Sequence, residues 1–160
     1  MFRPTLIPDR QPLRAMLVCS PGGHLMQMLA LRPAWDDLAR LWITLPAADT
    51  KALLSTENTV FAHGPTNRSI PNLLRNLLLA LRLVRQSKPD VILSTGAGLA
   101  VPFFIVGKLF GARLVYVESL TRIHGPSLSG RLVYPFSNRF FVQWPEAATL
   151  SRAEFAGRVL

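Results

Sequence analysis

Short apolar runs alternate with helix-patterned segments along almost the whole chain, and this alternation limits the folds that the chain can adopt. The clearest run, 90–94, is rich in β-branched residues and directly follows Pro89, which closes the preceding helical pattern. Strands that are separated by helices pair in parallel, with the helices as crossovers. The sequence therefore predicts a single, open, Rossmann-like α/β domain with a mostly parallel sheet.

The expected elements can be placed from hydrophobic periodicity and turn residues. Strands are expected at 15–20, 41–45, 59–62, 90–94, 113–117 and 139–142. Helices are expected at 24–38, 48–55, 70–86, 98–110 and 127–136, with Gly111 as the cap that ends the fourth. Residues 1–14 contain three prolines and are expected to form a flexible lead, so the domain occupies residues 15–160.

The charge of the chain is strongly positive. Its 160 residues include 18 lysines and arginines against 9 acidic residues, a net charge of +9. Such a surface indicates an anionic partner, which could be a nucleic acid, a membrane or a phosphorylated substrate. No zinc-finger spacing or basic–aromatic module is present, so we expect no nucleic-acid partner. Arginines mixed with leucines favour a membrane face or a lipid phosphate.

Cys19 is the only cysteine, and it lies in the first apolar run. One cysteine excludes an internal disulfide framework and an all-cysteine metal site. We therefore expect Cys19 to be a small buried hydrophobe. We expect neither a metal ion nor a cofactor.

No segment is predicted to cross a bilayer, which takes about 20 apolar residues. The best apolar run, 97–106, is shorter and is followed by Lys108. The N-terminal residues lack the apolar core of a signal peptide. The chain is therefore expected in the cytosol or on a membrane surface.

Three loops follow predicted strands, at the edge where ligands bind in open parallel sheets. The first, 20–24, reads SPGGH and opens a helix. Its glycines would let backbone amides approach a phosphate at the N-terminus of that helix. The alternative is an ordinary strand-to-helix turn, because neither the dinucleotide fingerprint nor a Walker loop is complete.

The other two loops also have two interpretations each. The second, 94–98 (STGAG), could bind a phosphate or be a close-packed turn, with Thr95 as a helix cap or a phosphate ligand. The third begins with Glu118, which could act as a general base or hold a sugar hydroxyl. Arg122 could clamp a phosphate, or Glu118 and Arg122 could form only a structural ion pair.

The predicted helix 70–86 carries more leucine than one face of a sheet needs. Leu79 interrupts a polar side that consists of Asn72, Arg75, Asn76, Arg82 and Arg85. The apolar arc consists of Leu73, Leu74, Leu77, Leu78, Leu81 and Val84. Surplus leucines beside arginines favour a helix that lies on a membrane surface. The membrane-facing residues are then expected to be Arg75, Leu79, Arg82 and Arg85. The alternative is a buried helix with a solvated basic edge.

Five motifs occur along the chain in a fixed order. They are Gly22-Gly23-His24, then Ser94-Thr95-Gly96-Ala97-Gly98 with Val101-Pro102, then Glu118-Ser119-x-x-Arg122, then Ser127-Leu128-Ser129-Gly130-Arg131, and finally Gln143-Trp144-Pro145-Glu146. This combination resembles the family of asparagine-linked glycosylation protein fourteen and its exopolysaccharide relatives of the PssD type. The resemblance extends from about Met16 to the C-terminus.

The resemblance implies a domain like the N-terminal half of a GT-B glycosyltransferase of the MurG kind. It implies a membrane-associated subunit that recruits a catalytic partner, which carries the C-terminal half and most of the UDP-sugar site. The subunit would present an acceptor linked to a lipid diphosphate. Eukaryotic members carry an N-terminal membrane helix, and none is found here, so we expect peripheral attachment at the cytoplasmic face of the membrane. A complete GT-B enzyme needs two Rossmann domains around a cleft, so the chain alone is expected to be inactive.

The favoured hypothesis is therefore a subunit of a heteromeric, metal-independent glycosyltransferase. His24 or Glu118 would be the base that deprotonates the acceptor hydroxyl. Substrate and diphosphate groups are expected to lie against Gly22, Gly23, Thr95, Gly96, Gly98, Ser119 and Arg122. Contacts with the partner are expected at Gln143, Trp144, Pro145 and Glu146.

Two other hypotheses remain open. The chain could be a membrane-surface scaffold without catalytic residues. It could also be a free-standing nucleotide-binding Rossmann protein, which is disfavoured because neither glycine loop completes a fingerprint.

Overall fold

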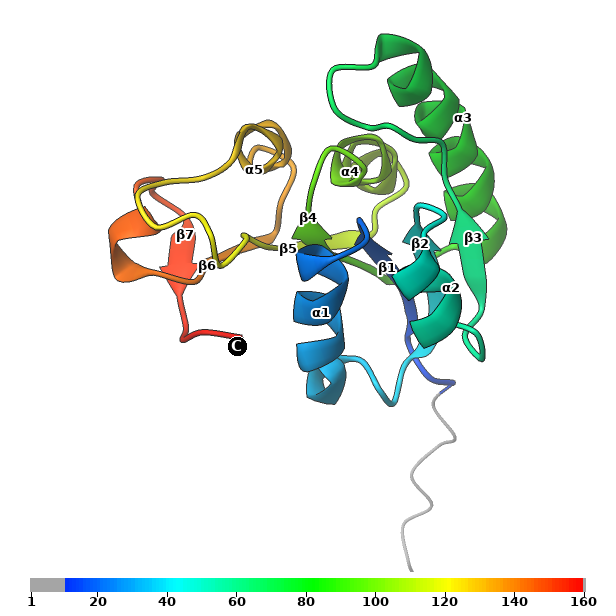
Figure 1. Ribbon diagram of the computed structural model, residues 1–160, viewed down its shortest axis with the longest axis horizontal. Helices are drawn as coiled ribbons and strands as arrows, with labels where there is room; N and C mark the ends of the chain where they lie inside the picture. Colours follow the sequence, from blue (N-terminus) through cyan, green and yellow to red (C-terminus); the bar gives the residue numbers. More distant parts are fainter. Residues whose placement is uncertain (1–10, 160) are drawn as a thin grey trace, which may run out of the picture.

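The computed structural model describes residues 11–159, which fold around a seven-stranded sheet (Figure 1). All neighbouring strands are parallel, and their order is β3-β2-β1-β4-β5-β6-β7. The strands are β1 (Arg14–Cys19), β2 (Ala39–Thr44), β3 (Thr59–Phe61), β4 (Val91–Gly96), β5 (Arg113–Val117), β6 (Arg139–Val142) and β7 (Ala153–Phe155). The predicted Rossmann-like α/β domain is confirmed, with a sheet that is parallel throughout.

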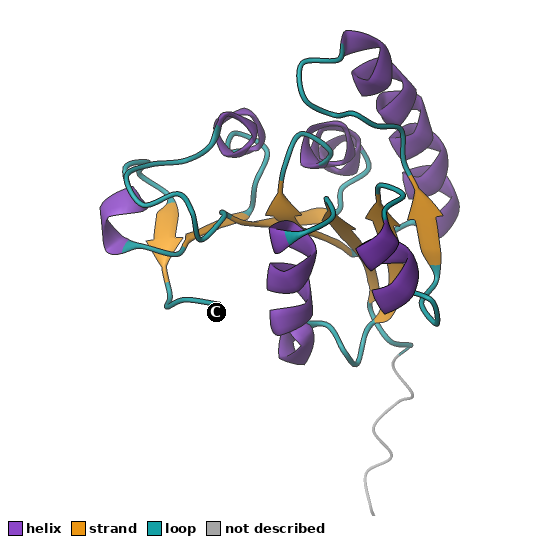
Figure 2. Ribbon diagram, viewed as in Figure 1, coloured by secondary structure: helices purple, strands orange, loops and turns teal. Residues whose placement is uncertain are grey.

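Helices cover both faces of this sheet (Figure 2). One face carries α1 (Gly23–Ala30) and α2 (Ala48–Leu53), and the other carries α3 (Ile70–Ser87), α4 (Ala100–Leu109) and α5 (Leu128–Val133). Because both faces are covered, a strand in the middle of the sheet must be apolar on both sides. This requirement explains the continuous apolar runs in the sequence.

Strand β1 shows how these runs build two separate cores. Its side chains alternate between the faces of the sheet, as in any strand. Met16 and Val18 belong to the core under α3 and α4, whereas Leu17 and Cys19 belong to the core under α1. Cys19 is fully buried, as expected. Burial, and then the charge of Asp49, raises the pKa of its thiol to about 12, so the thiol stays protonated and unreactive.

The prediction of one long helix over 24–38 is wrong in its second half. Helix α1 ends at Ala30, and a 3₁₀ turn at Arg32–Ala34 follows it before β2 begins at Ala39. Pro33 lies inside that turn and has no backbone N–H to continue the α-helical hydrogen bonds. Other helix boundaries differ by a few residues: α4 begins at Ala100 rather than 98, and α5 ends at Val133 rather than 136.

Two further features of the chain ends differ from the expectations. Strand β7 was not expected, because its run of three residues (AEF) is too short for a periodic signal. The predicted flexible lead at 1–14 falls largely on residues 1–10, which lie outside the described residues. Its last residue, Arg14, is the first residue of β1 and pairs with Ala39 of β2.

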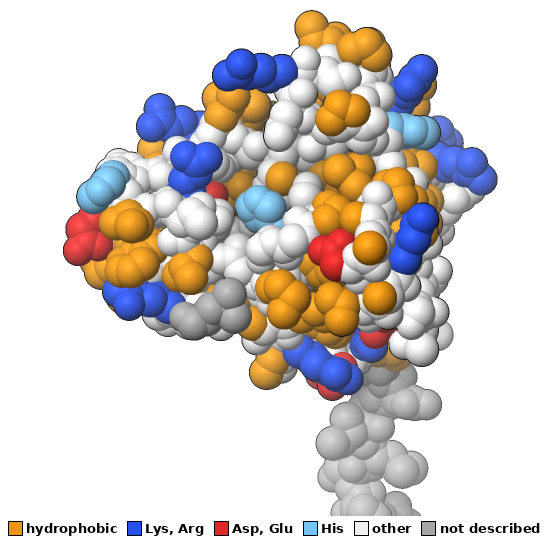
Figure 3. Space-filling view, in the orientation of Figure 1, with side chains coloured by type: hydrophobic (Ala, Val, Ile, Leu, Met, Phe, Trp, Pro, Cys, Tyr) orange, Lys and Arg blue, Asp and Glu red, His pale blue; other side chains and the backbone are white. Residues whose placement is uncertain are grey.

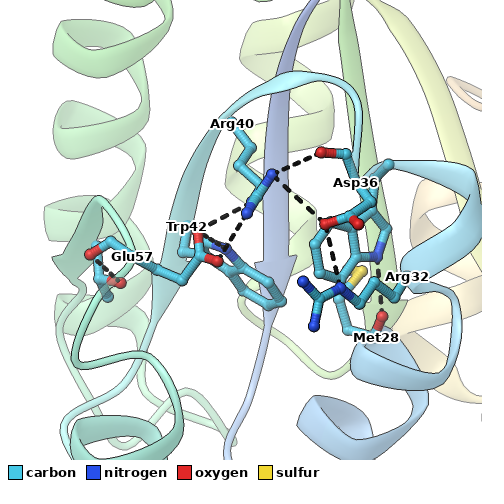
Figure 4. A network of polar contacts seen from close by, with 8 residues as sticks. Met28, Arg32, Asp36, Arg40, Trp42 and Glu57 are labelled. Atoms are coloured by element: carbon cyan, nitrogen blue, oxygen red, sulfur yellow. Dashed lines mark hydrogen bonds and ion pairs between the residues drawn. The ribbon is translucent and has the colours of Figure 1, made fainter.

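A network of polar contacts holds the start of β2 (Figure 4). The guanidinium of Arg40 donates to both carboxylate oxygens of Glu57, at 2.9 and 2.8 Å, and Trp42 Nε1 donates to the same carboxylate at 3.2 Å. The hydrogen bond from Arg40 is the main reason why the pKa of Glu57 lies below its usual range. Arg40 also lies within 3.9 Å of Asp36. These contacts bind the strand to the loop that precedes β3.

Within residues 11–159, no helix combines the length and the apolar content that a bilayer span requires.

Candidate functional site

The turns that follow β1 and β4 meet at the carboxyl edge of the sheet. These two strands are neighbours, and the strand order reverses between them, so their loops diverge to opposite faces. The β1–α1 turn contains Gly22, whose φ of 76° lies in the left-handed region that glycine adopts readily. Gly96, the last residue of β4 before the β4–α4 turn, has a φ of 123°. Both turns open helices, so two helix N-termini begin near this edge.

His24 is held by a reciprocal pair of hydrogen bonds across this junction. Its Nδ1 lies 2.8 Å from the carbonyl oxygen of Thr95, and the Thr95 hydroxyl donates to the carbonyl oxygen of His24 at 2.7 Å. A carbonyl oxygen can only accept, so Nδ1 must carry the proton. In the neutral ring Nε2 is then the free acceptor. This is the arrangement of a histidine that can take a proton from a substrate.

Gly96 makes room for the imidazole ring. A Cβ at this position would lie 2.8 Å from Cε1 of His24 and 3.3 Å from the hydroxyl of Tyr116. We expect Gly96→Ala to lower the free energy of unfolding by about 2 kcal/mol or more, because it adds both backbone strain and a collision with His24. Urea denaturation measures this loss.

Gly157→Ala is the matched control for that prediction. Gly157 also has a positive φ, 112°, but a Cβ there would meet nothing within 4 Å. It therefore reports the cost of the backbone conformation alone. Equal losses in the two variants would show that His24 does not depend on the absence of a side chain at Gly96.

Two of the glycine amides expected to face a diphosphate are already engaged. The Gly22 N–H donates to Oδ2 of Asp49 at 2.7 Å, and the Gly96 N–H donates to the Ser94 hydroxyl at 3.1 Å. Among the hydrogen bonds formed by residues 11–159, none uses the N–H of Gly23 or Gly98. These two amides, at the starts of α1 and α4, remain available for an anion.

Thr95 was expected to bind diphosphate or cap a helix, and the structure corrects both expectations. Its side chain is fully buried, and its hydroxyl is committed to the carbonyl of His24. It therefore positions the histidine and cannot reach a ligand itself. This role depends on a contact across 71 sequence positions, so no local pattern could have revealed it.

Glu118 is buried and holds the loop that follows β5. Its Oε1 accepts from the Ser119 N–H at 2.9 Å, and its Oε2 accepts from the N–H and the hydroxyl of Ser127 at 2.9 and 3.0 Å. A Cβ on Gly130 would collide with the same carboxylate. The carboxylate is therefore a clamp for residues 119–127, and both of its oxygens are occupied.

Ser119 and Arg122 lie on this clamped loop. The Ser119 hydroxyl is 2.9 Å from that of Thr121, and Arg122 donates its backbone N–H to the carbonyl of Ser119 at 3.0 Å. Arg122 is exposed, and it forms no ion pair with Glu118 among the described residues. Its guanidinium therefore remains available to an anionic ligand. The alternative expectation, a structural ion pair between Glu118 and Arg122, is not met.

Tyr116 is a residue of this region that the sequence did not indicate. Its hydroxyl is fully buried beside Gly96 and His24 and has no hydrogen-bond partner. Burial, and then the charge of Glu118, raises the pKa of this hydroxyl, so it stays protonated. It lies within an apolar run (RLVYV), where an aromatic residue ordinarily indicates only a core position.

Helix α3 turns two of its predicted polar residues inwards. Asn72 Nδ2 donates to the carbonyl of Pro65 at 3.0 Å, and the Asn76 amide pairs with the backbone N–H and carbonyl of His63 at 2.9 and 2.8 Å. Both asparagines are buried because they satisfy the backbone of the β3–α3 loop. The face opposite to them is therefore the exposed one.

That exposed face carries both leucines and arginines, as Figure 3 shows over α3. Leu74, Leu78 and Leu81 are 55%, 69% and 38% exposed, and the side chains of Arg75, Arg82 and Arg85 are also exposed. The expectation that Leu79 faces a membrane is wrong, since it is half-buried and packs against the core. The apolar part of this exposed face comes from Leu74, Leu78 and Leu81 instead.

The stretch expected to contact a partner is partly committed to this chain. Gln143 is buried, and its side chain donates to the carbonyl of Glu118 at 3.3 Å and accepts from the Val159 N–H at 2.7 Å. It is therefore not available to a partner, contrary to the expectation. Trp144 Nε1 donates to the carbonyl of Leu120 at 2.7 Å, while Pro145 and Glu146 are exposed.

No cluster of three or more His, Cys, Asp or Glu residues suited to hold a metal ion occurs in the described part of the chain, 11–159.

The chain is similar to proteins of known families. Residues 62–159 match the family described as "Oligosaccharide biosynthesis protein Alg14 like". The UDP-N-acetylglucosamine transferase subunit ALG14 of Homo sapiens is 36% identical over 173 residues, which cover 87% of this chain and 79% of the human protein. The corresponding subunit of Schizosaccharomyces pombe is 47% identical over 77 residues, which cover 44% of this chain and 37% of that protein.

The fold is similar to that of MurG from Acinetobacter baumannii. The TM-score is 0.73 at 18% sequence identity, over 90% of this chain and 45% of MurG. The chain therefore spans less than half the length of that protein and shares the fold of its N-terminal half, as the sequence predicted.

Proposed function

This chain belongs to the Alg14 family, and we propose that it is the acceptor-side subunit of a UDP-N-acetylglucosamine transferase. Its relatives in Homo sapiens and Schizosaccharomyces pombe are named as subunits of such a transferase. The likeness to one half of MurG supports a two-domain enzyme that is divided between two chains. A partner would then supply the second domain, which holds most of the UDP-sugar site.

The observation that carries this proposal is the geometry of His24. Its Nδ1–H is fixed on the Thr95 carbonyl, so Nε2 is the acceptor, and the ring stands at the N-terminus of α1. A neutral histidine is a suitable base near neutral pH. Of the two candidate bases, His24 is favoured over Glu118, because both carboxylate oxygens of Glu118 are engaged.

The reaction that fits this geometry is a direct displacement. Nε2 of His24 takes the proton of the acceptor hydroxyl while that oxygen bonds to the anomeric carbon of the donor sugar. The bond between that carbon and the diphosphate breaks, and UDP leaves with the electron pair. The chain's share of the reaction is to hold the acceptor and to remove its proton.

The acceptor is proposed to be linked to a lipid diphosphate. The free amides of Gly23 and Gly98 lie at two helix N-termini, where partial positive charge favours a phosphate. The exposed guanidinium of Arg122 can add a full positive charge. Gly22, Gly96 and Ser119 shape the surrounding turns.

The central test is reconstitution of sugar transfer. The chain, its cognate transferase partner, the UDP-sugar and the lipid-linked acceptor are mixed, and the product is followed by mass spectrometry. Transfer is expected only when both chains are present, because each supplies one wall of the cleft. Robust transfer by this chain alone would contradict the divided enzyme. No transfer by both chains with any UDP-sugar would contradict the transferase function itself.

We also propose that the subunit binds the cytoplasmic face of a membrane peripherally, through the exposed face of α3. Leucines there can enter the interface while arginines meet anionic head groups. The net charge of +9 adds a general attraction to such a surface. The acceptor lipid lies in the same membrane, so this contact would bring it to His24.

Leu74→Ser with Leu78→Ser is expected to weaken binding to vesicles that contain phosphatidylglycerol by about tenfold or more, because two exposed leucines no longer enter the interface. Vesicle sedimentation measures the bound fraction. The matched control is Leu53→Ser, since Leu53 is 50% exposed on α2, across the sheet. An equal loss in the control would assign the binding to general hydrophobicity rather than to α3.

The partner contact is proposed at Trp144, Pro145 and Glu146, without Gln143. The exposed pair Pro145 and Glu146 forms a 3₁₀ turn just after β6, and the Trp144 ring is covered by the guanidinium of Arg158 at 3.7 Å from the ring centroid. This turn is exposed and lies next to the clamped loop at 119–127, to which Trp144 is joined through the carbonyl of Leu120.

A membrane-surface scaffold without catalytic residues is the second candidate function. The engagement of the Glu118 carboxylate favours it, because this removes one of the two possible bases. His24→Ala separates the two functions, because only the catalytic function loses turnover in this variant.

A further inference from the structure

A cleft lies at the opposite edge of the sheet from His24. It has a volume of about 750 Å³ and is bordered by the amino ends of β1, β4 and β5 and by the C-terminal ends of α3 and α4. Strand β1 separates the two edges, from Arg14 at the cleft to Cys19 at the other end, a length of roughly 16 Å. The volume is in the range of small-molecule sites, about 300–1,000 Å³.

The cleft has an excess of positive charge. It is lined by Arg14, Arg85, Lys88 and Arg113, and by one carboxylate, that of Asp90. Asp90 is committed to Arg14, whose backbone N–H and Nε lie 2.8 and 3.4 Å from the same carboxylate oxygen. Among the described residues, no ion pair is formed by the other three cations. Three positive charges therefore remain uncompensated around one hollow.

The ends of helices account for only part of this charge. Arg85 lies in the last turn of α3 and Lys88 is its C-cap, where cations complement the helix dipole. Arg113 has no such role, because it opens a strand in the middle of the sheet. Arg113 nevertheless lines the same cleft as Arg85 and Lys88.

Apolar residues line the same cleft and form its apolar wall. Leu13 and Phe110 line the cleft and are 58% and 49% exposed, and Leu109, next to Phe110, is 77% exposed. Val84 completes the wall from α3. Large exposed apolar side chains beside unpaired cations suit a ligand that has both a charged and an apolar part.

We propose that this cleft binds the phosphate monoester of an amphiphile, with the phosphate among Arg85, Lys88 and Arg113 and the apolar part along Leu13 and Phe110. A phosphate monoester carries a charge of about −1.5 to −2 at neutral pH, which matches several cations better than a carboxylate or a phosphodiester does. Guanidinium groups also fit phosphate oxygens in pairs. The site is separate from the acceptor site proposed at His24.

Calorimetric titration of the full-length chain with dihexanoyl phosphatidic acid, kept monomeric, tests this proposal. We expect saturable binding of one molecule per chain. Lys88→Asn with Arg113→Gln is expected to weaken it by at least about tenfold, because two charged hydrogen-bond donors are lost. Asparagine suits the left-handed backbone of Lys88, whose φ is 45°. The single variants repeat the test if the double variant fails to fold.

Lys51→Gln with Arg131→Gln is the matched control, because it removes the same charge from exposed positions outside the cleft. Binding in this variant should stay within about twofold of the unmodified chain. An equal loss in both double variants, or no saturable binding at all, would overturn the proposal.

Further titrations with other variants and ligands identify the part of the ligand that is recognised. Leu13→Ser should weaken binding of the phosphatidic acid but not of inorganic phosphate. If inorganic phosphate binds as tightly as the phosphatidic acid, the proposal that the cleft recognises an apolar part is overturned. If dihexanoyl phosphatidylglycerol binds as tightly, the proposal that the cleft recognises a phosphate monoester is overturned. The α3 variant Leu74→Ser with Leu78→Ser should bind the monomeric lipid normally, so a failure of membrane attachment can be distinguished from a failure of this site.

Discussion

His24→Ala is expected to lower kcat of the reconstituted two-chain transferase by about 10²–10⁴-fold, the usual contribution of a positioned general base. The ring is fixed by the Thr95 carbonyl, and no other imidazole is held at this junction among residues 11–159. KM for the lipid-linked acceptor should change little, because binding rests on the amides and on Arg122. Initial rates at saturating UDP-sugar measure both constants.

His63→Ala is the control for this variant. His63 is exposed and contributes only its backbone to a hydrogen bond with Asn76, so its removal should leave kcat unchanged. Full turnover by His24→Ala would contradict general-base catalysis by this chain and support the scaffold. A loss of kcat together with a failure to bind the partner would instead indicate a structural role, so complex formation is measured in parallel.

Glu118→Ala is expected to lower the free energy of unfolding by about 3–5 kcal/mol, one of the larger losses for a single substitution. Three donors on the half-buried Ser119 and Ser127 lose their carboxylate acceptor, and the alanine leaves a cavity at the buried Glu118 position. The loop at 119–127 should open, which also displaces Arg122. Urea denaturation gives the loss, and amide exchange of residues 119–127 shows where it arises.

Glu118→Gln refines this test, because it keeps the shape of the side chain. The amide group can accept through one oxygen only, so one of the donors now on Oε1 and Oε2 loses its partner. We expect a smaller loss of stability than with alanine. Glu146→Ala, at an exposed position, should change stability by no more than about 0.5 kcal/mol. Glu118→Gln with normal stability and no turnover would reinstate Glu118 as the base.

The strands and the class of fold could be predicted because they rest on local signals. Apolar runs such as 90–94 are short, β-branched and separated by helical periods, which leaves few topologies other than a parallel sheet. The two elements that were predicted wrongly or missed also have local causes. Pro33 ended α1 earlier than the apolar period indicated, and β7 is too short to produce a period.

The orientation of α3 shows what periodicity leaves open. A helical wheel describes which residues share a face, but the buried face is decided by what packs against it. Asn72 and Asn76 are buried because the loop before α3 offers them backbone groups to bind. The leucines on the opposite face are exposed as a result, and the surface proposed to face a membrane differs from the predicted one at Leu79.

The sequence by itself therefore determined the parallel α/β domain, the glycine turn around Gly22 and the candidacy of His24. Only the tertiary structure decided which hydrogen-bond partners the side chains of the site have. Thr95 lies 71 positions from His24, yet its carbonyl oxygen accepts from the imidazole, and Ser127 donates its backbone N–H to the carboxylate of Glu118. Hydrogen bonds of this kind form between segments that the sheet brings together, and they decide which atoms of a side chain remain free for a ligand.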